Sequence, residues 1–289
     1  MKMKTLKGSV AVVTGAGSGI GRALAQELAS QGAELALADL NSAALEETRS
    51  LLSGTRAKTY TLDVADAAAV EGFARKVEQD FGRVSVLINN AGVALYGNFD
   101  ELTLKEFDWL FRINFWGVVH GCKSFLPLLK REPEAHIVNI SSVFGLIAPA
   151  GQTAYGASKF AVRGFTQALK GELESTGVSM TCVHPGGIRT NIAANARAGV
   201  NTRPEGWEER QQRFLKAART SPEKAAQTIV RGILRNKARV LIGGDAYFFE
   251  ALQRLFPVRC SPMIASWFNR QVAPPAQEPA GMKEKERSA

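Results

Sequence analysis

The chain has 289 residues, 45% of them hydrophobic, so it can bury a full core without a structural metal or a disulfide. Its three cysteines, Cys122, Cys182 and Cys260, lack the spacing of a metal site or a redox motif, and we expect the reducing environment of the cytoplasm. The net charge of +9 is spread along the chain without a nucleic-acid-binding motif, which argues against nucleic acid as a partner and favours a basic surface that attracts anionic cofactors.

Short runs of apolar, β-branched residues alternate along the chain with longer helical stretches. Most of these runs are too apolar to have a solvated face, as is typical of parallel strands that helices cover on both sides. The predicted strands are Val10–Thr14, Leu35–Asp39, Lys58–Leu62, Val84–Asn89, His136–Ser141, Met180–His184 and Arg239–Ile242. The predicted helices are Ile20–Gln31, Ser42–Leu52, Ala67–Phe81, Leu104–Lys130, Thr153–Ser175 and Pro222–Arg235. This order predicts one α/β catalytic domain over residues 1–245, a doubly wound, Rossmann-type parallel sheet of about seven strands with helices on both faces.

Two segments depart from this alternation. Residues 191–220, between the sixth and seventh strands, are expected to form either a lid or a pair of surface helices. Residues 246–272 carry apolar side chains at helical spacing and predict a helical extension packed on the domain; core or subunit contacts are favoured over a substrate cover or a membrane-surface contact. The composition of residues 273–289 predicts a disordered tail. No apolar run approaches the roughly 20 residues that span a bilayer, so we expect a soluble protein.

A glycine-rich loop follows the first predicted strand. Thr14–Gly21 reads TGAGSGIG and leads directly into a predicted helix. Gly15, Gly19 and Gly21 allow a sharp turn, close approach to a pyrophosphate and tight packing of the helix on the sheet, while the helix N-terminus offers N–H groups to the phosphates. A plain strand-to-helix turn is the alternative, but the context is the one that a dinucleotide site requires.

An acidic residue ends the second predicted strand. The Asp39 carboxylate can accept hydrogen bonds from both hydroxyls of an adenosine ribose, and it repels a 2′-phosphate. Ser18, inside the glycine loop, is not basic, so a frequent partner of that phosphate is missing. These residues predict NAD as the cofactor, with NADP less favoured. The alternative is that Asp39 only caps the next helix.

A tyrosine and a lysine lie four residues apart in the predicted helix that begins at residue 153. Tyr155 and Lys159 therefore share one helix face. A nearby ammonium lowers the pKa of a phenol, which suits a group that exchanges a proton with an alcohol or a carbonyl oxygen. Ser142, just after the fifth strand, can hydrogen-bond a substrate oxygen, although a serine there can also be a turn former. Asn114 lies in an apolar helical stretch where its amide needs partners.

Taken together, these motifs resemble those of the short-chain dehydrogenase/reductase family over residues 8–243. The resemblance is carried by TGAGSGIG, Leu62–Val64 (LDV), Asn89–Gly92 (NNAG), Asn114, the NISS that ends at Ser142, YGASK around Tyr155, and Pro185–Thr190 (PGGIRT). It implies a Rossmann-type sheet of seven parallel strands and an Asn–Ser–Tyr–Lys active site. It also implies oligomerisation, and we expect a homodimer or homotetramer formed through the helices that contain residues 104–130 and 155–175.

The resemblance also implies roles for individual residues. Tyr155 is the general acid/base, Ser142 holds the substrate oxygen, Lys159 lowers the tyrosine pKa and holds the nicotinamide ribose, and Asn114 keeps a water in a proton relay. The implied cofactor-binding residues are Gly15, Ser18, Gly19, Ile20, Gly21, Asp39, Asp63, Val64, Asn90, Tyr155, Lys159, Ile188 and Thr190. Among these, Asp63 and Val64 face adenine, Asn90 the adenosine ribose, and Ile188 and Thr190 the nicotinamide end. No metal site is predicted, and His184 is assigned to packing.

The leading functional prediction is an enzyme that interconverts a secondary alcohol and a ketone with NAD(P). The apolar residues near the expected pocket, such as Leu95, Phe144 and Ile147, favour an apolar, fairly bulky alcohol or ketone as the substrate. The alternatives are an NADPH-dependent carbonyl reductase of the same fold and a cofactor-sensing protein without turnover. The presence of both Tyr155 and Lys159 weighs against the sensor.

Overall fold

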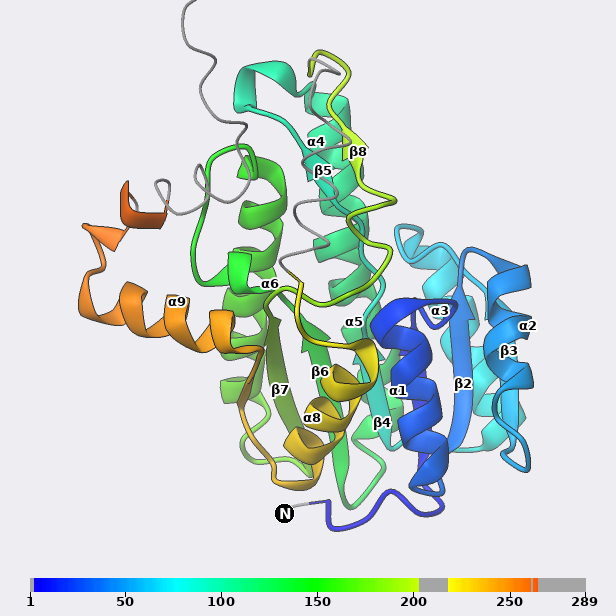
Figure 1. The fold of residues 1–289 in the computed structure, drawn as a ribbon. Helices are drawn as coiled ribbons and strands as arrows, with labels where there is room; N and C mark the ends of the chain where they lie inside the picture. The colour runs from blue at the N-terminus through cyan, green and yellow to red at the C-terminus, as the bar shows by residue number, and fades with distance from the viewer. Residues whose placement is uncertain (1–2, 203–217, 261, 265–289) are drawn as a thin grey trace, which may run out of the picture.

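The computed structural model describes residues 3–202, 218–260 and 262–264 (Figure 1). Its main sheet has seven parallel strands in the order β3-β2-β1-β4-β6-β7-β9. The strands are β1 (Val10–Thr14), β2 (Glu34–Asp39), β3 (Ala57–Thr61), β4 (Val86–Asn89), β6 (Ala135–Ile140), β7 (Val178–Pro185) and β9 (Arg239–Ile242). The doubly wound α/β architecture is thereby confirmed, and each of the seven predicted strands matches an observed strand to within two residues at either end.

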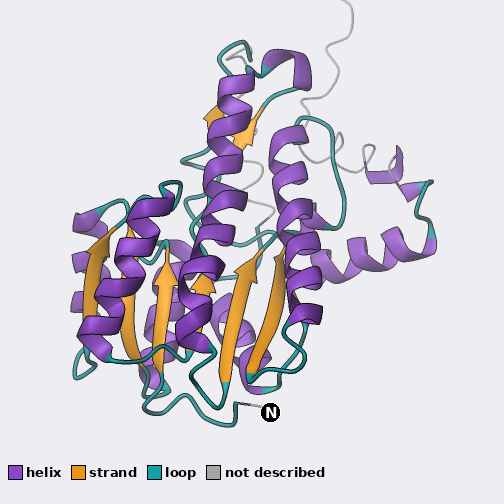
Figure 2. Cartoon of the chain, turned by 180° about the vertical axis from the view of Figure 1, so that it is seen from behind, coloured by secondary structure: helices purple, strands orange, loops and turns teal. Residues whose placement is uncertain are grey.

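Helices cover both faces of the sheet. They are α1 (Gly19–Ser30), α2 (Ser42–Ser50), α3 (Ala67–Phe81), α4 (Leu104–Phe111), α5 (Gly117–Leu129), α6 (Thr153–Glu172), α8 (Pro222–Leu234) and α9 (Gly244–Leu255). Figure 1 shows α1 and α8 side by side on one face, and Figure 2 shows the helices of the opposite face. Alternate residues of β1 divide between the two layers: Ala11 and Val13 pack under α1 and α8, whereas Val10 and Val12 pack under α3 and α5.

The strand order reverses next to β1, because the chain runs outward from β1 to β3 and then returns to place β4 on the other side. In an open parallel sheet, ligands bind beyond the carboxyl ends of the strands at such a reversal. The ends of β1 and β4 therefore mark where the site should lie.

The prediction of one continuous helix over Leu104–Lys130 is wrong in the middle of this range. The structure divides it into α4, a π-helical segment η2 (Arg112–Trp116) and α5. The wider turn accompanies Asn114, which is fully buried and hydrogen-bonds with its side chain to the backbone of Val93. A pattern of apolar residues with a period of 3.6 cannot distinguish such a turn from regular helix.

A small second sheet was not predicted. Strands β5 (Leu95–Tyr96) and β8 (Arg197–Ala198) pair in parallel, and in Figure 2 they lie beyond the arrowheads of the main strands. The guanidinium of Arg197 stacks 4.0 Å from the ring centroid of Trp109 on α4. The pairing holds the beginning of the segment after β7 against the chain after β4; residues 203–217 of that segment lie outside the described residues.

The C-terminal part of the chain continues from β9 into α9. Ala246 and Phe249 of α9 pack with Val143, the first residue of the short 3-10 helix η3 (Val143–Gly145), and with Ile147 just after it. Residues 265–289, including the predicted tail, lie outside the described residues. Within the ranges that are described, no helix is both long and apolar enough to cross a membrane, and no group of three or more His, Cys, Asp or Glu side chains is placed to hold a metal ion.

Candidate active site

The glycine loop joins β1 to α1 with backbone angles that favour glycine. Gly15 and Gly19 have φ values of +65° and +52°. A Cβ atom at Gly21 would lie 2.0 Å from the Gly15 carbonyl oxygen, so only glycine allows the helix to start this close to the loop. Gly15, Ser18, Gly19 and Ile20 line a large cavity, whereas Gly21 does not line it. A tight loop that ends in a helix N-terminus at a cavity fits the pyrophosphate of a dinucleotide.

Asn90 ties this loop to the end of β4. Its side-chain amide donates to the carbonyl oxygens of Thr14 (2.9 Å) and Gly15 (3.1 Å), and the Thr14 hydroxyl accepts from the N–H groups of Asn90 and Ala91. Asn90 also lines the cavity. Asn90 thus fixes the glycine loop to the end of β4, while its contact with the adenosine ribose stays a prediction.

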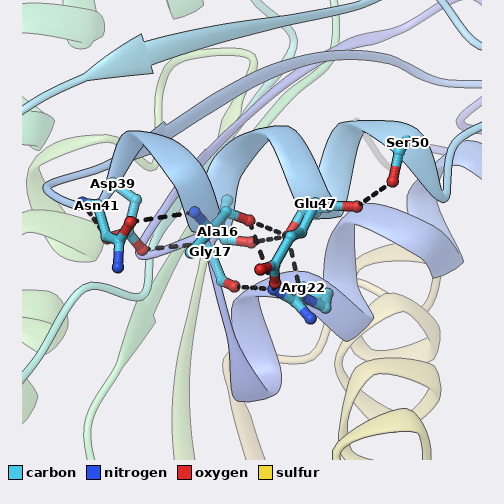
Figure 3. Close-up of polar contacts among 9 residues, drawn as sticks. Ala16, Gly17, Arg22, Asp39, Asn41, Glu47 and Ser50 are labelled. Atoms are coloured by element: carbon cyan, nitrogen blue, oxygen red, sulfur yellow. Dashed lines mark hydrogen bonds and ion pairs between the residues drawn. The ribbon is translucent and has the colours of Figure 1, made fainter.

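The Asp39 carboxylate lies on the cavity wall at the end of β2. One oxygen accepts from the Gly17 N–H at 2.9 Å, and the other accepts from the Asn41 N–H at 3.0 Å (Figure 3). The N-cap of α2 is Asn41, which accepts from Ala44, so the alternative that Asp39 caps this helix is wrong. A carboxylate has about four acceptor positions. The acceptor positions that these two contacts leave open can accept hydrogen bonds from the hydroxyls of an adenosine ribose.

Ser142, Tyr155 and Lys159 lie together on the wall of the same cavity, whose volume is about 1130 Å³. Ser142 follows β6 and accepts from the Phe144 N–H at 3.1 Å. Tyr155 and Lys159 lie one turn apart near the start of α6, with the lysine nitrogen 5.7 Å from the centroid of the tyrosine ring. The lysine nitrogen also donates to the Ile140 carbonyl oxygen at 3.1 Å. These contacts fix the lysine beside the tyrosine.

Burial shifts both titratable groups toward their neutral forms. It raises the pKa of the Tyr155 phenol, and a hydrogen bond with Ser142 opposes that rise. It lowers the pKa of the Lys159 ammonium from 10.5 to about 8, against the opposing influence of Cys182. The Lys159 side chain is therefore still protonated at neutral pH. This charge lies 5.7 Å from the centroid of the Tyr155 ring, and its predicted lowering of the tyrosine pKa stays a prediction.

Asn114 lies behind this group rather than on the cavity wall. Its side-chain oxygen accepts from the Val93 N–H at 2.8 Å, and its amide donates to the Val93 carbonyl oxygen at 3.0 Å and to the Ser158 hydroxyl at 3.3 Å. A Cβ atom at Gly92 would meet both the Asn114 oxygen (3.2 Å) and the Lys159 nitrogen (3.4 Å), so these atoms flank the same glycine. The amide is thus committed to Val93, and its role in a water relay stays a prediction.

The other predicted cofactor-binding residues also reach the cavity. Its wall includes Asp63, Val64, Ile188 and Thr190. Val64 follows β3, and its carbonyl oxygen lies 3.0 Å from Nδ1 of His120. The loop after β7, which carries Ile188 and Thr190, approaches the glycine loop so closely that a Cβ atom at Gly19 would lie 3.2 Å from the Thr190 side chain. Segments that are far apart in the sequence therefore enclose one site.

Two residues near the site carry contacts that sequence patterns did not reveal. His184 was assigned to packing, but its Nδ1 lies 3.0 Å from the Ser142 carbonyl oxygen; burial lowers its pKa to about 4, so the ring is neutral and Nδ1–H donates. Asp245, in the first turn of α9, accepts from the Gly187 N–H at 2.7 Å and holds the loop after β7. His184 precedes the PGG motif, which is a weak signal, whereas nothing in the sequence links Asp245 to a glycine 58 residues earlier.

Known proteins share this architecture. Residues 9–201 match the family described as short chain dehydrogenase. Oxidoreductase SadH of Mycobacterium tuberculosis is 45% identical over 268 residues, which are 91% of this chain and 96% of that protein. Estradiol 17-beta-dehydrogenase 11 of Homo sapiens is 32% identical over 267 residues, 89% of this chain and 82% of that protein. The crystal structure of a short-chain dehydrogenase/reductase from Burkholderia phymatum in complex with NAD has a TM-score of 0.81 and 31% identity, covering 90% of this chain and 97% of that one.

Proposed function

Because this chain belongs to the short-chain dehydrogenase/reductase family, and is thus an oxidoreductase acting on CH–OH groups with NAD or NADP, we propose that it prefers NAD and interconverts an apolar secondary alcohol and its ketone. One observation carries the proposal. Tyr155, Ser142 and Lys159 lie on the wall of the cavity that also contains the glycine loop and the Asp39 carboxylate. A proton-transfer group and a dinucleotide cradle therefore open into the same space.

The protein's own residues handle the proton and the substrate oxygen. In the oxidative direction the Tyr155 phenolate accepts the alcohol proton, and in the reductive direction the phenol donates a proton to the carbonyl oxygen. The Ser142 hydroxyl hydrogen-bonds the same substrate oxygen as charge develops on it. The Lys159 ammonium stabilises the phenolate. When bound, the nicotinamide supplies the hydride acceptor or donor.

The residues around the cavity fit an extended NAD molecule. The glycine loop and the N-terminus of α1 would hold the pyrophosphate, and Asp39 would hold the adenosine ribose. By similarity to the family, Asp63 and Val64 would contact adenine, and Ile188 and Thr190 the nicotinamide end. Each of these side chains lines the cavity.

The cavity wall near the proposed reaction centre carries several apolar side chains. They are Leu95, Val143, Phe144, Pro149, Ile192 and Phe249, and the same wall also includes polar residues such as Asn98, Gln152 and Asn195. Transferring apolar groups to such a wall is favourable by about 25 cal/mol per Å² of buried surface. An uncharged, apolar alcohol therefore fits better than a sugar or a carboxylate. The relative named estradiol 17-beta-dehydrogenase supports the same class of reaction.

Assembly and location are part of the same proposal. Exposed aromatic side chains lie on the helical faces that family members use for subunit contacts: Trp116 is 48% exposed and Phe160 is 38% exposed. We place the enzyme in the cytoplasm as a homodimer or homotetramer.

Replacing Asp39 with Ala should invert or remove the preference for NAD. Hydrogen bonds to a charged group contribute about 1.5–3 kcal/mol, so NAD affinity should fall about 10- to 100-fold, whereas NADP is released from repulsion by the carboxylate. Titration of both cofactors into both proteins measures the effect. Asp108→Ala, at an exposed aspartate paired with Arg112, is the control. Wild-type protein that binds NADP more tightly than NAD would contradict the proposed preference.

A further inference from the structure

The side chain of Arg22 connects the glycine loop to α2. Arg22 lies one turn into α1, and its Nη2 donates to the Gly17 carbonyl oxygen at 2.6 Å (Figure 3). Its Nε donates to the Thr48 hydroxyl at 3.0 Å, and Nη2 also lies 2.8 Å from a Glu47 carboxylate oxygen. Glu47 is 67% exposed, so water screens that ion pair, whereas the contacts with Gly17 and Thr48 are partly buried.

Thr48 extends the connection to the preceding residue of the loop. It is fully buried on α2, and its hydroxyl accepts from Arg22 and lies 2.9 Å from the Ala16 carbonyl oxygen and 3.1 Å from that of Ala44. The single hydroxyl proton is shared between these two acceptors. Arg22 and Thr48 thus hold two consecutive carbonyl groups of the glycine loop, those of Ala16 and Gly17.

Holding these carbonyls also orients the N–H groups of the same peptide units. In a trans peptide the C=O and N–H bonds point in opposite directions. The unit whose carbonyl Thr48 holds therefore directs the Gly17 N–H the other way, where it donates to Asp39 at 2.9 Å. The unit whose carbonyl Arg22 holds directs the Ser18 N–H away from Arg22. A peptide unit thus links Thr48 directly to the carboxylate that faces the ribose.

We propose that Arg22 and Thr48 are positioning residues that set the cofactor preference by fixing Asp39 through the Ala16–Gly17 and Gly17–Ser18 peptide units. Neither side chain lines the cavity, so each acts through the loop rather than by touching the cofactor. The inference rests on the proposed NAD preference and adds to it the residues that keep the carboxylate in place.

The test compares NAD and NADP as cofactors for wild type, Arg22→Leu, Arg22→Lys and Thr48→Val. Arg22→Leu should raise the KM for NAD about tenfold, as expected when hydrogen bonds that involve a charged group are lost, while kcat at saturating NAD stays within about twofold. The KM for NADP should rise less, because a loosened Asp39 repels the 2′-phosphate less. Arg22→Lys keeps the charge and can reach one carbonyl group, so its NAD-to-NADP ratio of kcat/KM should lie between those of Arg22→Leu and wild type. Thr48→Val keeps the shape of the buried side chain and should likewise lower the NAD-to-NADP ratio of kcat/KM. It can be assayed even where Arg22→Leu is too unstable.

The double variant and a surface control separate positioning from general damage. In the Asp39→Ala background, Arg22→Leu should leave the NAD-to-NADP ratio of kcat/KM unchanged, because the carboxylate through which it acts is gone. Arg49→Leu, at an exposed arginine of α2 that pairs with Glu46, should match wild type. Equal rises in both KM values with an unchanged ratio in Arg22→Leu and Thr48→Val would overturn the inference while leaving the NAD preference intact. A wild type that prefers NADP would instead overturn the proposed preference itself.

Discussion

Replacing Tyr155 with Phe should lower kcat by between about 10²- and 10⁴-fold, the usual contribution of general acid–base catalysis. The substitution removes only the hydroxyl that exchanges the proton, while the ring remains packed edge-on against Phe144 at 6.1 Å between centroids. The cradle around the glycine loop and Asp39 is untouched, so NAD affinity should stay near the wild-type value. Steady-state assays with a panel of secondary alcohols, together with cofactor titration, measure both quantities.

The matched control for this variant is Tyr247→Phe. Tyr247 lies on α9, is 60% exposed and does not line the cavity, so its hydroxyl should be dispensable. A Tyr155→Phe protein that turned over at the wild-type rate would remove Tyr155 from its proposed role. No turnover in wild type, with intact NAD binding, would favour the cofactor-sensing alternative.

Replacing Lys159 with Met should reduce activity and increase stability at neutral pH. Without the ammonium, burial keeps the pKa of Tyr155 high, so the pH at which alcohol oxidation reaches half its maximal rate should move upward. The buried ammonium itself is costly: its pKa falls from 10.5 in the unfolded chain to about 8, which corresponds to about 3 kcal/mol of destabilisation. Loss of the hydrogen bond to Ile140 offsets about 1 kcal/mol of that gain.

The pH dependence of this stability difference has a definite sign. Because the folded pKa is lower than the unfolded one, the cost of burying the charge is fully present below pH 8 and disappears as the pH rises from about 8 to 10.5. Urea unfolding should therefore show Lys159→Met more stable than wild type at pH 7, with the difference shrinking by pH 10. An unchanged pH–rate profile, or a stability difference that does not vary over this range, would contradict the assigned role and environment of Lys159.

The strands and the cofactor cradle were predictable from the sequence because they depend on local patterns. Runs such as Val10–Thr14 are buried on both faces, and an uninterrupted apolar run signals this directly. The glycine loop was recognisable because the φ of +65° at Gly15 favours glycine and the contact at Gly21 leaves no room for a Cβ atom. The proximity of Tyr155 and Lys159 was predictable because helical spacing places residues four apart on one face.

The features that were missed depend on contacts between distant segments. The pairing of β5 with β8 joins strands about a hundred residues apart and only two residues long, too short for an alternating pattern. The π-helical turn at Asn114 preserves the apolar spacing of a regular helix. The hydrogen bond from Arg22 to Gly17 links close residues, but its bond to Thr48 depends on how α1 packs against α2. Such contacts follow from tertiary structure and not from local preference.

The transfer of deuterium from a labelled substrate tests the proposed alcohol oxidation most directly. Wild-type protein is incubated with NAD and an apolar secondary alcohol that carries deuterium on its carbinol carbon, and the reduced cofactor is analysed by mass spectrometry. We expect the deuterium to move from that carbon to the nicotinamide, and Tyr155→Phe to slow this transfer by about 10²-fold or more. Wild-type protein that binds NAD but transfers no deuterium from any of a panel of secondary alcohols would contradict the proposed alcohol oxidation.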